Sequence, residues 1–264
     1  MPNPSPARMH DFEVVSNEEI AEGIFSLVTL APRLASALKP GQFVNIRVPG
    51  DASELLRIPL SYVSADAEHG TVEIWYAVVG NATRRMSQWK PGFTSDLLGP
   101  GGRGWKAPEG TKRALVVGGG IGVPPVLCLA RELVSAGVAV DACVGAASAS
   151  KLVGLEDFRA LGCDQVCVAT DDGSAGACGF CTEPASELLA AGGYDYVATC
   201  GPGVMMSKVA AAAAEAGVYC EASLERMMSC GFGACSTCNV ETTDGMQGAC
   251  MCGPVFDASK VVVW

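Results

Sequence analysis

Histidine is scarce in this chain: His10 and His69 are the only two among 264 residues. Neither lies in a motif that suggests a metal ligand or a general base, so histidine chemistry is not expected. The sequence also has no run of about eighteen apolar residues that could span a bilayer, and its first residues lack the apolar region of a signal peptide. We therefore expect a cytoplasmic protein with no membrane partner.

Positive charge is also in short supply. The chain has 18 Lys and Arg residues against 28 Asp and Glu residues, which gives a formal net charge of -10. Binding to nucleic acid needs a basic face that contacts phosphates, so no nucleic acid is expected as a partner. Hydrophobic residues make up 49% of the chain, enough for the core of one large domain or of two ordinary domains and a small module.

Helix signals are scarce in the N-terminal part of the chain. Between residues 12 and 98, the short β-type segments GIFSLVTLA, GQFVNIRVP, IPLSYVSA and TVEIWYAVV are separated by Pro-Gly turns and by turns rich in Asn, Asp or Gly. This pattern is typical of a small antiparallel barrel or sandwich. We expect that domain to occupy residues 1–104.

From residue 105 onwards, strands and helices alternate. RALVVGGG, VPPVLCLARELVSAG and VAVDACVGAAS have the order strand, glycine-rich turn, helix and strand. DQVCVATDDG and YDYVATCGPG add further strands, and helices are expected at about 184–191 and 205–216. The alternation predicts an α/β domain with a parallel sheet over residues 105–222. Residues 223–264 fit neither pattern, are rich in cysteine and glycine, and are expected to form a separate module.

Five of the thirteen cysteines lie in this C-terminal module. Cys230, Cys235 and Cys238 have C-x4-C-x2-C spacing, and eleven residues separate Cys238 from Cys250, which matches the plant-type [2Fe–2S] arrangement. A reducing cytosol argues against disulfides. Structural zinc is the alternative, but such a site usually adds a second C-x2-C pair or histidines, which are absent here. Cys252 competes with Cys250 as the fourth ligand.

A glycine-rich turn follows the first strand of the α/β domain, in LVVGGGIGVPPV. Bare backbone at the start of a helix lets a pyrophosphate approach, although a tight turn without a ligand is the alternative. The motif departs from G-x-G-x-x-G because Val123 replaces the last glycine, and Asp141, at about the distance of a ribose-binding acid, lies in mid-strand. Cys200, in TCGPGVMM, ends a later strand, where ligands of open α/β sheets bind.

The barrel segment contains LLRIPLSYVS and WYAVVGNATRRM. An arginine and a hydroxyl group near a strand end suit a phosphate, whereas Pro59, Leu60 and Tyr76 suit a flat ring. A solvated surface arginine is the alternative. In the α/β domain, Cys178 and Cys181 form a C-x2-C pair, but the pair follows an Asp-Asp-Gly turn and is not expected to open a helix, which argues against a thioredoxin-like role.

The order of the three sites, together with RIPLS, VVGNAT, VGGGIGVPP, TDDGSAGACGF, CGPGVM, SLERMMSCGFGACSTC and GPVF, resembles the electron-transfer subunits of class 1B dihydroorotate dehydrogenases, members of the ferredoxin–NADP reductase superfamily. The resemblance covers about residues 12–256. It implies an antiparallel β-barrel that binds FAD, an α/β parallel-sheet domain that binds NAD, and a C-terminal [2Fe–2S] module. A flavin is also expected on chemical grounds, because the cluster passes single electrons and NAD takes a two-electron hydride.

The resemblance further implies an FMN-containing catalytic partner subunit, in a heterotetramer. Dihydroorotate would be oxidised to orotate in that partner, as a step of pyrimidine biosynthesis, and the electrons would cross this chain to NAD+. No catalytic residue for the substrate chemistry is expected here. Two alternatives stay open: a reductase subunit of another complex, of the hydrogenase or ferredoxin:NADP oxidoreductase type, and a zinc-stabilised binding protein without redox activity.

Site residues follow from the same resemblance. The implied FAD contacts are Arg57, Pro59, Leu60, Ser61, Tyr76, Ala77, Val78, Ala82 and Thr83. The implied nicotinamide-nucleotide contacts are Gly119, Gly120, Ile121, Gly122, Cys200, Gly201, Pro202 and Met205. The implied cluster ligands are Cys230, Cys235, Cys238 and Cys250, the last of which lies three residues before the Gly-Pro of GPVF.

The sequence departs from the family pattern at two FAD positions. Ile58 stands where the family has its arginine, and the shift to Arg57 turns the side chain to the opposite face of a strand. Ala82 replaces a frequent glycine. In the nucleotide domain, AASASK offers Lys151 but no arginine for a 2′-phosphate, so NAD is expected over NADP.

Overall fold

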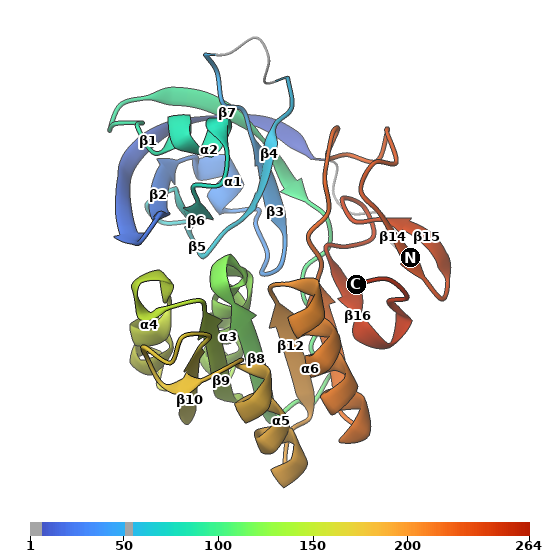
Figure 1. Cartoon of the computed structure of the whole chain (residues 1–264). Helices are drawn as coiled ribbons and strands as arrows, with labels where there is room; N and C mark the ends of the chain where they lie inside the picture. The colour runs from blue at the N-terminus through green and yellow to red at the C-terminus, as the bar shows by residue number, and fades with distance from the viewer. Residues whose placement is uncertain (1–6, 51–54) are drawn as a thin grey trace.

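The computed structural model describes residues 7–50 and 55–264. It contains a curved antiparallel sheet, here called the barrel sheet, and a mainly parallel sheet flanked by helices (Figure 1). The C-terminal segment, drawn in orange to red, lies beside both sheets. The predicted fold class, an antiparallel β-barrel followed by an α/β domain with a parallel sheet, is confirmed, and the barrel is an open half-barrel.

The barrel sheet has the strand order β4-β3-β7-β1-β2-β6-β5, and its neighbouring strands pair antiparallel. Its strands are β1 (Arg8–Ala21), β2 (Ile24–Leu30), β3 (Phe43–Ile46), β4 (Ile58–Ser61), β5 (Ser64–Asp66), β6 (Thr71–Ala77) and β7 (Thr94–Gly101). Two short helices, α1 (Pro32–Ala35) and α2 (Asn81–Met86), accompany them. Side chains alternate between the two faces of a strand. Accordingly, every second residue points into the barrel and is fully buried there, as are Val44, Ile46, Val72 and Ile74.

The parallel sheet has the strand order β11-β10-β9-β8-β12-β13-β16. Its strands are β8 (Arg113–Gly119), β9 (Ala139–Ala146), β10 (Gln165–Thr170), β11 (Ala177–Cys178), β12 (Tyr196–Cys200), β13 (Tyr219–Ser223) and β16 (Val255–Asp257). All neighbours pair parallel except β16, which pairs antiparallel with β13. The strand order reverses between β8 and β12, which is the switch point where open α/β sheets bind ligands.

Helices cover both faces of the parallel sheet (Figure 1). The helices are α3 (Val123–Ser135), α4 (Leu155–Ala160), α5 (Thr182–Ala191) and α6 (Gly203–Glu215), and 3-10 turns lie at Gly120–Gly122, Ala149–Lys151 and Ala258–Lys260. Val116 of β8 packs with α3 and with Phe158 of α4, whereas Leu115 packs with α5 and α6. Within the described residues, none of the helices has the length and apolar character that a membrane crossing needs.

The C-terminal segment shares a hydrophobic core with the parallel sheet. It contains the hairpin of β14 (Asn239–Thr242) and β15 (Gly245–Gly248), followed by β16. Cys238, Val240 and Cys250 are buried in the same cluster as Leu115 of β8 and Phe43 of β3. The cysteine-rich segment is therefore packed against both sheets, and its place relative to them is set by buried contacts.

Candidate functional site

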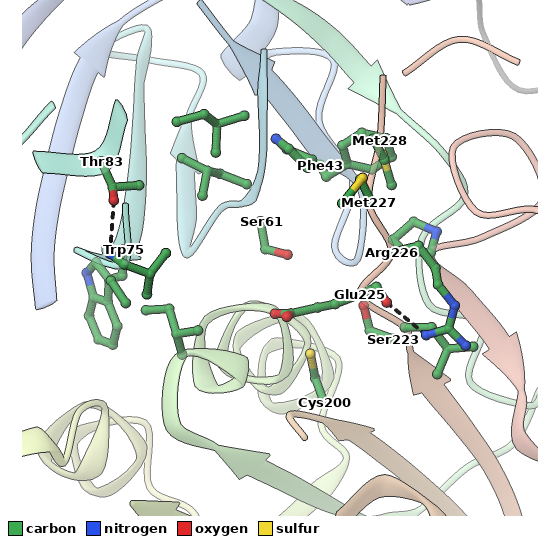
Figure 2. Close-up of a pocket in the computed structure, with 18 residues that line it drawn as sticks. Phe43, Ser61, Trp75, Thr83, Cys200, Ser223, Glu225, Arg226, Met227 and Met228 are labelled. Carbon is green, nitrogen blue, oxygen red and sulfur yellow. Dashed lines mark hydrogen bonds between the residues drawn. The ribbon is translucent and has the colours of Figure 1, made fainter. Parts of the chain in front are cut away.

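A cavity of about 440 Å³, here called the central cavity, lies where the two sheets and the C-terminal segment meet. The barrel sheet contributes β4 and β6, the parallel sheet contributes the end of β12, and residues 223–228 close the remaining side (Figure 2). Of the residues expected at the flavin and nucleotide sites, it brings together Pro59, Leu60, Ser61, Ala77, Thr83, Ile121 and Cys200. Segments that are far apart in the sequence thus form one site.

Three polar side chains point into the central cavity. Figure 2 shows the Ser61 hydroxyl, the Cys200 thiol and the Glu225 carboxylate directed toward the same space, from β4, β12 and the loop after β13. Burial raises the pKa of the Cys200 thiol to about 12, so this thiol stays protonated at neutral pH. Burial also raises the pKa of Glu225 above its usual range. The site therefore holds a hydroxyl, a neutral thiol and a carboxyl group that keeps its proton to a higher pH than usual.

Thr83 fixes the turn at the start of α2 on one side of this cavity. Its hydroxyl oxygen accepts a hydrogen bond from the backbone N–H of Val79 at 3.0 Å (Figure 2) and another from the N–H of Gly80 at 3.1 Å. Ala82 and Val78 belong to the same turn but do not line the cavity; both pack against the interior of the barrel sheet. The turn places backbone at the rim of the cavity without exposing these two side chains to it.

Tyr76 does not have the position that the sequence suggested. Its ring is fully buried inside the barrel sheet, where its hydroxyl donates a 3.0 Å hydrogen bond to Asn17 and burial raises its pKa to about 12. The neighbouring aromatic, Trp75, lines the cavity instead, and its indole N–H donates to Glu73 at 2.8 Å. Side chains alternate along β6, so Trp75 and Ala77 share one face and Tyr76 has the other. A flat ring in the cavity therefore meets Trp75.

Arg57 also lies outside the lining of the central cavity. Its guanidinium donates a 3.2 Å hydrogen bond to the backbone carbonyl of Asp96 and another to the Asp96 carboxylate. Arg47 approaches the same carboxylate at 3.2 Å. The shift from position 58 to position 57 thus leaves the arginine, which directly precedes the edge strand β4, bound to Asp96 of the inner strand β7.

A second cavity, of about 310 Å³ and here called the nucleotide cavity, lies at the carboxyl ends of β8, β9 and β10. Its lining includes Gly119, Gly120, Pro202 and Met205, which are among the residues expected at the nucleotide site. A Cβ added at Gly119 would lie 2.5 Å from the Met205 sulfur, so the Met205 side chain packs directly on the bare Gly119 backbone and would have to move for a larger residue. The result is bare backbone at the sheet edge beside the start of α6.

Gly122 and Gly201 lie between the two cavities and line neither. A Cβ added at Gly122 would overlap the backbone carbonyl of Cys200, so the turn after β8 packs directly on the end of β12. Ile121 and Cys200 face the central cavity, whereas Gly120 and Pro202 face the nucleotide cavity. The expected nicotinamide residues therefore form the wall that the two cavities share.

The sequence did not point to four other residues that line the nucleotide cavity: Asp171, Phe180, Thr182 and Lys208. The Lys208 ammonium lies 5.4 Å from the centre of the Phe180 ring. These residues lie just after β10, next to the start of α5 and in the second turn of α6. Positions that follow the carboxyl ends of the strands could have indicated them from the sequence. Asp141 is fully buried and accepts hydrogen bonds from Arg113 and Tyr194, so its mid-strand position has a structural role.

The C-x2-C pair at Cys178 and Cys181 corrects one expectation. α5 begins at Thr182, two residues earlier than predicted, so Cys181 directly precedes a helix. Cys181 is buried, and burial raises its pKa to about 11. A thiol whose pKa is raised is a poor nucleophile, so Cys181 lacks the lowered pKa of a thioredoxin-like site.

The four cysteines expected as cluster ligands gather in two neighbouring pairs. Cys230 lies beside Cys235, whose pKa is lowered to about 6 by hydrogen bonds from Thr237 and from Cys230, and Cys238 lies beside Cys250, whose pKa is raised by burial and by the Cys238 thiol. The backbone N–H of Cys250 also approaches the Cys238 sulfur at 3.4 Å. Across the described residues, no three His, Cys, Asp or Glu side chains surround a single metal ion. A two-iron cluster takes two ligands on each iron, so two pairs fit it better than they fit zinc.

The loop at residues 230–238, here called the cysteine loop, has the backbone that such a site needs. Gly231, Gly233 and Ser236 have φ values of +76°, +88° and +59°, in the left-handed region. This conformation turns backbone N–H groups inward, and the N–H of Ala234 donates to the Cys230 sulfur at 3.2 Å. Cys252 is partly buried against the shared core, and its N–H donates to the Gly248 carbonyl.

The solved structures with the same architecture include two reductases. An NADH-dependent reduced ferredoxin–NADP oxidoreductase is 31% identical, with a TM-score of 0.86 over 95% of this chain and 89% of that chain. The cytochrome b5 reductase domain of Ulva prolifera nitrate reductase is 14% identical, with a TM-score of 0.65 over 80% of this chain and 94% of that chain, and shows the fold alone. The fold is therefore that of ferredoxin–NADP reductase-type proteins.

Sequence relatives narrow this class to one family. The family model of the iron-sulfur cluster binding domain of dihydroorotate dehydrogenase B matches residues 225–262. The dihydroorotate dehydrogenase B (NAD(+)) electron transfer subunits of Bacillus caldolyticus and Geobacillus kaustophilus are each 40% identical, over 95% of this chain and 97% of theirs. The chain belongs to the family of dihydroorotate dehydrogenase B electron transfer subunits.

Proposed function

We propose that this chain carries electrons from an FMN-containing dihydroorotate dehydrogenase subunit through a [2Fe–2S] cluster and FAD to NAD+, within a heterotetramer that serves pyrimidine biosynthesis. One observation carries the proposal: the central cavity adjoins the glycine turn of the nucleotide cavity on one side and the segment that leads into the cysteine loop on the other. The relatives' names supply the substrate and the acceptor.

We assign FAD to the central cavity and the barrel sheet beside it. Ser61, Thr83 and Trp75 surround the space with a hydroxyl group, a fixed turn and an aromatic ring. The proposed contacts also include Pro59, Leu60 and Ala77, which line the cavity. They include as well Arg57, Val78 and Ala82, each of which is next to a lining residue in the sequence. Tyr76 would contribute its backbone only, because its ring is buried.

We assign NAD to the nucleotide cavity and the wall that it shares with the central cavity. The dinucleotide phosphates would lie against the bare backbone of Gly119 to Gly122, at the N-terminal end of α3, where the helix dipole favours negative charge. The nicotinamide would lie near Cys200, Gly201, Pro202 and Met205. The exposed turn after β9 contains Lys151 but no arginine that could bind a 2′-phosphate. NAD therefore stays the proposed cofactor over NADP.

We assign the cluster to Cys230, Cys235, Cys238 and Cys250. The left-handed residues of the cysteine loop support the first three ligands, and the position of Cys250 beside Cys238 supports Cys250 over Cys252 as the fourth. The proposed division of the chain is 1–104 for FAD, 105–222 for NAD and 223–264 for the cluster. Met227, exposed to solvent, and Met228 line the central cavity just before Cys230, so the cluster segment forms part of the flavin site.

A bound flavin can exchange a hydride with NAD and single electrons with an iron–sulfur cluster, which is why it belongs between the two. The residues of this chain hold it and control protons around it. Glu225 and Ser61 place a carboxyl and a hydroxyl group on the cavity wall, and the raised pKa of Glu225 favours its protonated form. Cys200 is a neutral thiol at the point where the two cavities meet.

The purified chain tests this assignment. We expect visible absorption from flavin and [2Fe–2S], one FAD and two irons per chain, and NADH oxidation with artificial electron acceptors. A colourless protein that contains zinc would contradict the redox assignment. A coloured protein, replete with FAD and iron, that fails to oxidise NADH would contradict the nucleotide site. Oxidation of dihydroorotate by the isolated chain would contradict the division of labour with a partner.

A second candidate function is reduction of a ferredoxin in a different complex, which the 31% identity to the ferredoxin–NADP oxidoreductase favours. The 40% identity to the dihydroorotate dehydrogenase B subunits favours the main proposal. The chain that co-purifies with this one separates them, because only the main proposal requires an FMN-containing partner.

A further inference from the structure

Asn45 is a buried polar residue in β3 that none of the proposed sites includes. It is 3% exposed and alternates with Val44 and Ile46, whose side chains are buried inside the barrel sheet. Asn45 therefore projects from the outer face of the sheet. Phe43 lies on the same face and packs in the core that contains Cys238, so this face of β3 meets the C-terminal segment.

The side-chain amide of Asn45 lies against the cysteine loop. A Cβ added at Gly231 would overlap Asn45 Nδ2, so the amide nitrogen occupies the space beside the Gly231 backbone. Gly231 follows Cys230, whose sulfur lies inside the same turn and accepts the hydrogen bond from the Ala234 N–H. The barrel sheet thus places a hydrogen-bond donor next to the first cysteine of the loop.

This donor has no acceptor in the part of the chain that the structure describes. Asn45 Nδ2 is buried and lacks a hydrogen-bond partner within residues 7–50 and 55–264. Its cross-strand neighbours are Pro59 in β4 and Leu98 in β7, and neither side chain can accept a hydrogen bond. Because an unpaired buried amide costs free energy, such groups in native proteins normally have a partner. The space beside Gly231 is where that partner has to be.

We propose that Asn45 Nδ2 donates a hydrogen bond to sulfur of the iron–sulfur site, either the Cys230 thiolate or a sulfide of the cluster, and thereby raises the reduction potential of the cluster. The inference rests on the proposed cluster at the four cysteines. A reduced cluster carries one more negative charge than an oxidised one, and hydrogen bonds to its sulfurs stabilise that charge. Asn45, a residue of the barrel sheet that holds the proposed flavin, would therefore help to set the reduction potential of the cluster.

The test is a redox titration of the purified, FAD- and iron-containing chain, followed by the electron paramagnetic resonance of the reduced cluster. Asn45→Leu keeps the size of the side chain and removes the donor, so the cluster potential should fall while the potential of the flavin stays the same. Asn45→Val, which suits a strand, should give the same result if the leucine variant does not fold. Loss of iron from both variants, with FAD retained, would also support a contact with the cluster.

Asn17→Leu is the matched control. The variant removes a side-chain amide of the barrel sheet that already has a partner, because Asn17 Nδ2 donates a 2.8 Å hydrogen bond to the backbone carbonyl of Met86. The cluster potential should therefore stay unchanged. An unchanged cluster potential in an iron-replete Asn45→Leu protein would overturn the inference and leave the cluster assignment intact. Absence of iron and sulfide from the wild-type chain would overturn the cluster assignment itself, and the two failures are thus distinguishable.

Discussion

Arg57, just before β4, is bound to Asp96 in β7 through both the backbone carbonyl and the carboxylate of that residue. The two side chains are 23% and 15% exposed, so solvent screens their interaction less than it screens an ordinary surface pair. In FAD-free protein we predict that Arg57→Ala and Asp96→Ala each lower the free energy of unfolding, with a coupling of about 1–3 kcal/mol. Urea denaturation of the two single variants and the double variant measures this coupling.

The same two variants test whether Arg57 also binds the flavin. If it does, Arg57→Ala weakens FAD retention by a further 1.5–3 kcal/mol or so, the usual value for a hydrogen bond to a charged group, whereas Asp96→Ala does not. Equal FAD affinity in the Arg57→Ala and wild-type proteins, measured by equilibrium dialysis, would show that another group binds the phosphate.

The fourth cluster ligand provides a second prediction. Cys250 and Cys238 are both buried, and the Cys250 N–H lies 3.4 Å from the Cys238 sulfur, whereas Cys252 is only partly buried. Cys250→Ser should therefore lose the cluster or change its spectrum strongly, and Cys252→Ser should keep it. Iron analysis and electron paramagnetic resonance of the reduced proteins distinguish the two, and each variant is the size-matched control for the other. Loss of the signal in the Cys252 variant alone would reverse the assignment.

Glu225 gives a prediction for the pH dependence of stability. Burial raises its pKa above the ordinary value of 4.5, so its contribution to stability is complete below pH 4.5 and is lost as the pH rises through the folded-state pKa. In FAD-free protein, Glu225→Gln should unfold at a higher urea concentration than wild type at pH 8. The difference should vanish near pH 4. A variant that is less stable than wild type at pH 8 would mean that the carboxylate has a favourable partner.

Two glycines of the turn after β8 should respond differently to alanine. A Cβ at Gly122 would overlap the Cys200 backbone, so Gly122→Ala has to separate the turn from β12 and should cost several kcal/mol of stability. Gly120 has a φ of +54° but no atom within 4 Å of an added Cβ, so Gly120→Ala should cost only about 1–2 kcal/mol of backbone strain. Thermal denaturation compares them, and equal losses would contradict the packing of this turn.

Much of the fold follows from local patterns. Alternating apolar residues in GIFSLVTLA and TVEIWYAVV predict β2 and β6, and the strand-turn-helix order of LVVGGGIGVPPV predicts β8 and α3. The positions of Ser61 and Cys200 at strand ends predict that both meet a ligand, and the structure brings them to one cavity. Such features depend on neighbours in the sequence, which is why the sequence shows them.

The remaining features depend on contacts between distant segments. Trp75 and Tyr76 are adjacent aromatics in a strand that is buried on both faces, so alternation alone does not tell which one faces the cavity. The antiparallel addition of β16 to β13 brings residues 255–257 beside residues 221–223, a pairing for which no local pattern exists. Glu225 and Met228 follow β13 directly and line the cavity. Their position depends on this pairing of β13 with β16, and not on the local sequence.

Dihydroorotate-dependent reduction of NAD+ is the measurement that tests the proposed relay most directly. The chain, loaded with FAD and iron, is combined with the FMN-containing catalytic subunit, and formation of NADH is followed after addition of dihydroorotate. We predict NADH only when both chains are present, and its loss when the Cys250→Ser variant replaces the wild type. NADH formation at an undiminished rate with the cluster-free variant, or by either chain alone, would contradict the electron-transfer role.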